Sequence, residues 1–154
     1  VDISKKGTQF CPAAQIESTA KAIFARLKKQ NFLVGLDRAH FISAIVDFYE
    51  RTNELHPFRE GNGRSTRLWL DAILKKELGQ VIDWSLVDKD DYLLAMERSP
   101  IKDLEIKVLL KAALTDRIND REVYMKGVDA SYHYEGYDVY KTKDIKGDKN
   151  NARG

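Results

Sequence analysis

The residues of this 154-residue chain that could do chemistry gather in one short segment, residues 56–67, which reads HPFREGNGRSTR. Its centre, Gly61-Asn62-Gly63, stands just before a predicted helix. The two glycines let the backbone adopt positive φ angles and let a ligand come close. The first N–H groups of a helix have no partner within the helix and lie at the positive end of its dipole. The segment therefore predicts a cradle for an anion such as phosphate.

Charged residues on both sides of this cradle extend the prediction. Arg64 and Arg67 are three positions apart, so they share one helix face, and each offers a planar fork that matches phosphate oxygens. Glu60 could hold a Mg²⁺ ion that bridges phosphates. His56, at the start of the segment, is suited to general acid–base work near neutral pH. A base, an anion cradle, a metal carboxylate and two arginines together indicate phosphoryl or nucleotidyl transfer.

Each of these residues alone has an ordinary structural explanation. A Gly-Asn-Gly before a helix is usually a simple connection, His56 next to a proline is typical of a helix C-cap, and lone charged residues are usually solvated. The complete pattern, His-x-Phe-x-[Asp/Glu]-Gly-Asn-Gly-Arg-x-x-Arg, is far more specific, since a random match is rarer than about one in 10⁷. We interpret Phe58 as an apolar anchor that fixes the loop to the core.

This pattern resembles the signature of the Fic family (filamentation induced by cAMP), and all of its fixed positions match. The helical layout from about Pro12 to Tyr134 also looks like the Fic core. The resemblance implies an all-α, Fic-fold helical bundle with a short β-hairpin flap near the N-terminus, at residues 1–10. It also implies a Mg²⁺-dependent protein adenylyltransferase, which transfers AMP from ATP to a Tyr, Ser or Thr hydroxyl of a target protein aligned by the flap through strand addition.

The resemblance assigns roles within the segment. His56 is implied to deprotonate the target hydroxyl, whose oxygen attacks the α-phosphorus while pyrophosphate leaves. Glu60 is implied to ligate Mg²⁺. Arg64 is implied to hold the β-phosphate and Arg67 the γ-phosphate. The residues whose backbone is implied to bind the α- and β-phosphates are Gly61, Asn62 and Gly63.

A second motif lies at residues 131–136, which read SYHYEG. It resembles the family's inhibitory motif, [Ser/Thr]-x-x-x-Glu-[Gly/Asn], as found in the subgroup with a C-terminal inhibitory helix. We expect Glu135 to pair with Arg67, which would withdraw this arginine from the γ-phosphate and misalign ATP. The alternative is that Glu135 is an ordinary exposed carboxylate. The fixed positions of the motif are Ser131, Glu135 and Gly136. The neighbouring tyrosines that are candidates for self-modification are Tyr132, Tyr134 and Tyr137.

The elements that must position both motifs are predicted to be helices. Apolar spacing, caps and chain breakers indicate helices that start at Pro12, Asp37, Arg64, Asp88, Lys102 and Asn119-Asp120. The third is apolar nearly all round, so we expect it to be central and buried, and Gly79 should close it. The fifth should run over about residues 102–118. The sixth should be interrupted at Gly127, with a last turn over 129–134, and residues 138–143 are a candidate short strand.

The expected domain organisation is a single Fic domain over residues 1–140, followed by a basic polar tail. The length and a 43% apolar content suit one domain that can bury a core. The tail carries a charge of +3, which exceeds the +2 of the whole chain, so the folded part is nearly neutral and nucleic-acid binding is not favoured. The expected segments are the flap (1–10), the helical core (12–118), the C-terminal inhibitory segment (120–136) and the tail (141–154).

Composition indicates neither a membrane span nor an oxidising compartment. The longest unbroken apolar run, residues 92–96, is far shorter than the ~20 residues that cross a bilayer. The polar residues 1–9 do not resemble a signal peptide, and Cys11 is the one cysteine, so we expect a cytoplasmic protein. The expected partners are ATP and the target protein, and a homo-oligomer is left open.

Two alternatives to an adenylyltransferase remain open at this point. One is a related Fic-fold transferase that uses another nucleotide or phosphate-linked donor. The other is a catalytically silent module that binds a nucleotide or a partner. The resemblance also implies that bacterial members often act as growth-arresting toxins, some of them on DNA topoisomerases.

Overall fold

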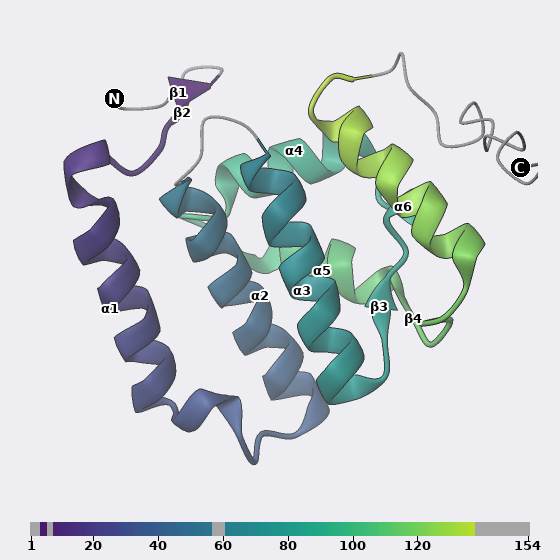
Figure 1. Cartoon of the computed structure of the whole chain (residues 1–154), viewed down its shortest axis with the longest axis horizontal. Coiled ribbons are helices and arrows are strands. Elements are labelled where there is room, and N and C mark those ends of the chain that lie inside the picture. The colour runs from purple at the N-terminus through teal and green to yellow at the C-terminus, as the bar shows by residue number, and fades with distance from the viewer. Residues whose placement is uncertain (1–3, 6–7, 57–60, 138–154) are drawn as a thin grey trace, which may run out of the picture.

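The computed structural model describes residues 4–5, 8–56 and 61–137, and α2 and α3 lie side by side at its centre (Figure 1). α1 packs against α2 on one side, and α6 packs against α3 on the other. In chain order the helices are α1 (Ile16–Lys29), α2 (Arg38–Leu55), α3 (Asn62–Leu78), α4 (Lys89–Arg98), α5 (Leu104–Ala112) and α6 (Arg121–Tyr134). Short 3₁₀ turns lie at Ala13–Gln15, Asn31–Leu33 and Trp84–Leu86.

The expected all-α class with a small hairpin near the N-terminus is confirmed. β1 (Ser4–Lys5) pairs antiparallel with β2 (Thr8–Gln9), in the register Ser4 with Gln9 and Lys5 with Thr8. In Figure 1 this hairpin lies at the end of the bundle where α2 ends and α3 begins. The hairpin is therefore at the end of the molecule that carries the first motif.

Local sequence signals set the ends of the helices. The Asp37 side chain accepts the His40 N–H at 3.0 Å and caps α2, and the Asp88 carboxylate caps α4 in the same way. Gly79 closes α3 with a φ of 62°, as expected for a glycine after the last turn. The apolar stripe predicted for α2 is buried, and its members are Phe41, Ile42, Ile45, Phe48 and Tyr49.

One apolar cluster joins all of the helices, and Trp84 stands at the point where α3, α4 and α6 meet. Its ring meets the rings of Tyr92 and Tyr134 edge to face, at centroid distances of 5.9 and 6.3 Å. The Tyr134 hydroxyl is buried and donates to the carbonyl oxygens of Trp84 and Val87, both at 2.7 Å. Tyr134 therefore fixes the last turn of α6 to the chain before α4.

Two predicted features of the helices are wrong. α3 is not buried all round, because Leu68 is 58% exposed and Ala72 is also exposed. α5 ends at Ala112 rather than near residue 118, because the chain then forms β4 (Leu114–Thr115). β4 pairs antiparallel with β3 (Val81–Ile82), a partner more than thirty positions away that helical periodicity cannot reveal.

The predicted interruption of the sixth helix at Gly127 is also wrong, since α6 continues through this position. A Cβ built at Gly127 would lie 3.5 Å from Trp84 Cδ1, so this turn of the helix passes close over the indole. Tertiary packing here outweighs the low helix propensity of glycine. The candidate strand at 138–143 and the tail at 141–154 lie outside the described residues. None of the described helices combines the length and the apolarity that crossing a bilayer requires.

Replacing Tyr134 with Phe should destabilise the protein by about 1–2 kcal/mol, because the carbonyls of Trp84 and Val87 each lose a hydrogen bond, although Trp84 O keeps the Val87 N–H. Urea unfolding followed by circular dichroism measures this change in the free energy of unfolding. Tyr124→Phe is the matched control, because Tyr124 is on the same helix and exposed. Equal unfolding midpoints for the two variants would contradict the assigned role of Tyr134.

Candidate active site

The first motif spans the junction between α2 and α3. His56 follows the last residue of α2, and Gly61 precedes the first residue of α3. Residues 57–60 between them, which include Phe58 and Glu60, lie outside the described residues. His56 has a φ of 48°, in the left-handed region that few residues other than glycine adopt, so its backbone is held in a sparsely populated conformation.

The segment that follows the hairpin packs on the predicted base. The Phe10 ring stacks on the His56 imidazole with a centroid distance of 3.7 Å and an interplanar angle of 15°. The next amide, of Cys11, donates to the carbonyl of Glu54 in the last turn of α2 at 3.2 Å. The end of β2 is therefore tied to the imidazole and to the helix that presents it.

Hydrogen bonds to the carbonyl oxygens of residues 61–63 stabilise the first turn of α3. Gly61 has a φ of 77°, and its carbonyl accepts both the Ser65 N–H at 2.8 Å and the Ser65 hydroxyl at 2.7 Å. The Thr66 hydroxyl lies 2.9 Å from the carbonyl oxygen of Asn62 and 3.0 Å from that of Gly63. The Asn62 side chain is buried beneath this turn. These bonds hold the predicted cradle in one shape before any ligand binds.

The amides of the predicted cradle are not all open to a ligand, because a carboxylate of the same chain reaches one of them. Glu135 Oε1 accepts the backbone N–H of Arg64, in the first turn of α3, at 3.2 Å. Arg64 Nε lies 2.7 Å from Glu135 Oε2, and Arg67 Nη2 lies 3.2 Å from Oε1. The expected pair of Glu135 with Arg67 is thus present. The Glu135 carboxylate therefore lies where the helix dipole, the Arg64 amide and the two arginines all stabilise a negative charge.

The shape of the second motif explains how α6 delivers this carboxylate. α6 ends at Tyr134, and Gly136 follows with a φ of 87°. The Gly136 N–H donates to His133 O at 3.0 Å, and the Tyr137 N–H donates to Tyr132 O at 3.0 Å, which closes the helix end. Glycine at 136 is needed for this left-handed closure, which leaves Glu135 at the helix terminus facing α3.

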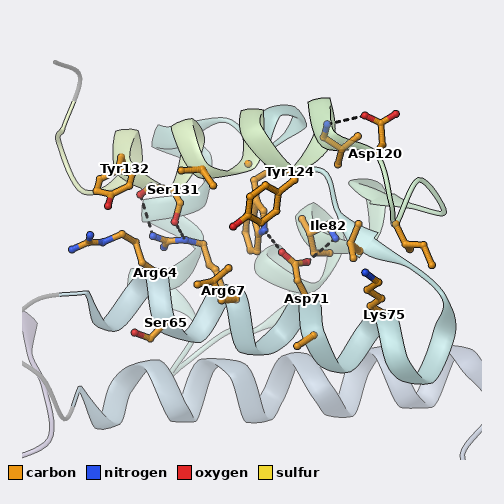
Figure 2. A pocket seen from close by; sticks show the side chains of 18 of the residues that line it. Arg64, Ser65, Arg67, Asp71, Lys75, Ile82, Asp120, Tyr124, Ser131 and Tyr132 are labelled. Atoms are coloured by element: carbon orange, nitrogen blue, oxygen red, sulfur yellow. Dashed lines mark hydrogen bonds between the residues drawn. The ribbon is translucent and has the colours of Figure 1, made fainter. Parts of the chain in front are cut away.

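Arg67 is 4% exposed, and its donors reach two other helices, α4 and α6; Figure 2 shows the contact with Ser131 of α6. Nε donates to the Ser131 hydroxyl at 2.8 Å, Nη2 to the Ser131 carbonyl at 3.1 Å, and Nη1 to the Tyr92 hydroxyl at 3.2 Å. Burial by itself would lower the pKa of Arg67, but Tyr92, Tyr49 and Glu135 raise it above its ordinary value, so the guanidinium stays charged.

The sequence did not reveal that tyrosine side chains surround the Arg67 guanidinium. The Tyr92 hydroxyl that receives Arg67 is hydrogen-bonded in turn to the Tyr49 hydroxyl, which is fully buried in α2. The guanidinium also lies over the Tyr134 ring, 5.3 Å from its centroid. The signal available in the sequence was apolar spacing, which classed Tyr49 and Tyr92 as core residues and could not show their hydroxyls converging on Arg67.

The tyrosines beside the second motif differ in access. Tyr134 is 4% exposed and its hydroxyl donates to Trp84 O, so a modifying group could not reach this hydroxyl in this conformation. Tyr132 is partly exposed and lies under the Arg64 guanidinium, 4.7 Å from centroid to Cζ. Tyr137 is exposed and meets the Tyr132 ring edge to face at 6.1 Å. Tyr132 and Tyr137 remain candidates.

A cavity of about 590 Å³ continues from this anion position along the groove between α3 and α6 (Figure 2). Its walls combine apolar and aromatic side chains, including Leu68 and Tyr124, with Lys75 and Arg117. Asp71 anchors its floor, because its two oxygens accept the Ile82 N–H and the Trp84 indole N–H, both at 2.8 Å. Burial raises the pKa of Asp71 to about 6. A space of this volume is typical of small-molecule sites.

Comparisons of the sequence and the fold with known proteins find similarity to Fic proteins. Residues 1–74 match the family model described as Fic/DOC family. The "Probable protein adenylyltransferase Fic" of Escherichia coli K12 is 29% identical over 122 residues, and "Protein adenylyltransferase VbhT" of Bartonella schoenbuchensis is 31% identical over 151 residues. These alignments cover 79% and 90% of this chain, but the chain spans only 60% and 31% of the length of these relatives.

Two solved Bartonella structures share the fold, each with a TM-score of 0.64. One is the BepC protein of Bartonella tribocorum with bound AMPPNP, 25% identical, with coverage of 74% of this chain and 56% of that one. The other is the N-terminal Fic domain of a putative cell filamentation protein of Bartonella quintana with bound ADP. It is 26% identical, and the match covers 80% of this chain and 57% of that one.

Gly63 should tolerate a methyl group poorly because of the side chains packed against it. A Cβ there would lie 2.8 Å from Arg67 Nη1 and 3.2 Å from Glu135 Oε1, and Arg67 has no room to retreat. Gly63→Ala should therefore reduce the free energy of unfolding by about 1–3 kcal/mol.

The matched control is Gly127→Ala, where the new Cβ meets only Trp84 Cδ1, at 3.5 Å. This helix-interior change should stabilise the protein by about 0.4–1 kcal/mol. Chemical denaturation measures both values. A Gly63→Ala variant as stable as the parent protein would contradict the close approach of Arg67 and Glu135 to this turn.

Proposed function

The chain belongs to the Fic/DOC family, and on this premise we propose that it is a protein adenylyltransferase inhibited by its own α6. It transfers AMP from ATP to a Tyr, Ser or Thr hydroxyl of a target protein. The observation that carries the proposal is the placement of the Glu135 carboxylate on the first-turn amide of α3 and beside two arginines. A site that holds one anion in this way can hold a phosphate.

In the proposed reaction His56 is the general base. It takes the proton of the target hydroxyl, the hydroxyl oxygen bonds to the α-phosphorus, and the bond from this phosphorus to the bridging oxygen breaks, so that pyrophosphate leaves. Arg64 and Arg67 neutralise charge on the phosphates, and the backbone of residues 61–63 holds them. The Phe10 stack supports this role for His56, because it fixes the plane of the imidazole before the target arrives.

We propose that Glu60, which precedes the cradle and lies outside the described residues, ligates Mg²⁺. A carboxylate beside a phosphate cradle is the donor that Mg²⁺ commonly uses together with phosphate oxygens. When bound, the ion would neutralise phosphate charge. The target protein is proposed to add as an extended strand to the β1–β2 hairpin, which is tied to the end of α2.

Inhibition follows from competition for the same donors. The Glu135 carboxylate takes the Arg64 amide and part of Arg67, both of which the ATP phosphates need. It also places a negative charge beside a negative ligand. ATP would then bind with its α-phosphate displaced from the line of attack. The proposed inhibitory unit comprises Ser131 and Glu135, which hold Arg67, and Gly136, which closes the helix.

The second candidate function is a module that binds nucleotide without turnover. The cavity between α3 and α6 supports the binding of a nucleotide. Both an active adenylyltransferase and an inactive binding module would need such a cavity, so the cavity does not distinguish these two functions. A related transferase with another phosphate-linked donor is a third possibility, because the cradle recognises phosphate rather than the base. Parallel assays with labelled ATP and with other labelled donors separate this last case from adenylyl transfer.

Replacing Glu135 with Gly should raise AMP transfer on the order of 10²-fold, because Arg64 and Arg67 become available to the phosphates. Transfer of label from α-³²P ATP to proteins of a cell lysate measures the rate and also reports the size of the target. Glu122→Ala is the matched control: it removes a carboxylate from the exposed first turn of the same helix, where Glu122 pairs only with Lys126 among the described residues. Equal rates for the Glu135→Gly and Glu122→Ala proteins would refute inhibition by Glu135.

His56→Ala, made in the Glu135→Gly protein, should reduce transfer by about 10²–10⁴-fold while ATP binding is retained. The measurement pairs the same transfer assay with calorimetric titration of ATP. A variant that still transfers AMP at the rate of its parent would show that the imidazole is not the base. The His40→Ala protein is the control, because His40 is exposed at the far end of α2.

A further inference from the structure

A second group of carboxylates lies where α2 packs against the start of α5, apart from the Glu135 site. Asp47 and Glu50 come from α2, and Asp103 immediately precedes α5. One potential ligand oxygen from each of the three lies within 4.8 Å of the others. Three carboxylates brought together across two helices repel one another unless a positive charge or a proton compensates them.

Glu50 distinguishes this group from an ordinary acidic surface. It is 9% exposed, and its Oε1 is buried with no hydrogen-bond partner among the described residues. A buried carboxylate oxygen without a partner is rare and needs an explanation, because its desolvation is not offset. Burial, followed by the charge of Asp103, raises the pKa of Glu50 to about 8.

The cations nearby engage the outer members of the group. Lys107 Nζ lies 2.6 Å from Asp103 Oδ2, and Arg51 Nε lies 3.2 Å from Asp47 Oδ2. Arg26 Nη2 lies 3.7 Å from the same Asp47 oxygen. The described ion pairs thus use Oδ2 of each aspartate, so the second oxygen of each can serve as a ligand. None of the described ion pairs includes Glu50.

We propose that Asp47, Glu50 and Asp103 form a binding site for a hard divalent cation of the size of Ca²⁺. All of the donors are oxygens, which suits Ca²⁺ or Mg²⁺ rather than zinc or copper. Oxygens bound to one Ca²⁺ lie at most about 5 Å apart, and the three carboxylate oxygens lie within 4.8 Å of one another, so all three can reach one ion. Mg²⁺ needs opposite oxygens about 4.2 Å apart and octahedral order, so it should bind more weakly.

The residues around the proposed site let a cation enter from solvent and determine how tightly it should bind. The Asp103 side chain is 42% exposed, which gives the ion access from solvent and room for water ligands. The neighbouring arginines and Lys107 reduce the negative potential, so we expect a dissociation constant of about 10⁻⁴ M. The bound cation would link α2, which ends at His56, to the start of α5, and its first effect would be on stability. The proposal does not depend on the proposed transferase activity.

The test is calorimetric titration of Ca²⁺ into the full chain after treatment with EDTA, without nucleotide, together with thermal unfolding at 0 and 5 mM Ca²⁺. The background protein carries Glu60→Gln, so that the proposed catalytic metal residue cannot contribute. We expect one saturable site per chain and a rise in Tm of a few degrees. Titration of Mg²⁺ under the same conditions should show at least several-fold weaker binding.

Glu50→Gln keeps the shape of the buried side chain and should weaken Ca²⁺ binding at least tenfold and remove the rise in Tm. Asp103→Asn is the second variant, and it breaks no helix cap, because the Asp103 side chain makes no capping hydrogen bond. Circular dichroism identifies which variants fold. Absence of saturable Ca²⁺ binding, or undiminished binding in either folded variant, overturns the proposal.

Discussion

A buried positive charge, that of Arg67, is the constraint around which α3, α4 and α6 are arranged. An uncompensated buried guanidinium costs several kcal/mol, so each of its donors must find an acceptor. The acceptors come from the Tyr92 hydroxyl on α4 and from Ser131 and Glu135 at the end of α6. The position of α6 therefore depends on a specific set of hydrogen bonds as well as on apolar packing. A shift of α6 by one turn would leave the charge without Ser131 and Glu135.

Under the proposed function the same requirement creates a switch. Arg67 must be neutralised by an anion, and either Glu135 or a phosphate can fill this role. The two cannot share the position without repulsion, so binding of a correctly placed triphosphate requires Glu135 to leave. The stability of the α6 end and the activity of the enzyme would then be opposed, and the balance between them is set by a few hydrogen bonds.

Features encoded by local or family patterns could be predicted from the sequence. The cap at Asp37, the closure at Gly79 and the pairing of Glu135 with Arg67 are of this kind. The pairing of β3 with β4, and the continuity of α6 through Gly127, depend on contacts between distant segments and were not predictable from periodicity. For the same reason the sequence could not show hydroxyl groups of core tyrosines converging on an arginine, or acids from α2 and α5 meeting.

Under the proposed function, the stack of Phe10 on His56 would constrain the geometry of proton transfer. The Phe10 ring covers one face of the imidazole, so solvent and reactants cannot approach the ring from that side. The parallel contact permits the ring to turn within its own plane and resists tilting out of it. A hydroxyl group that approaches in this plane would therefore meet a lone pair that the Phe10 ring keeps within one plane.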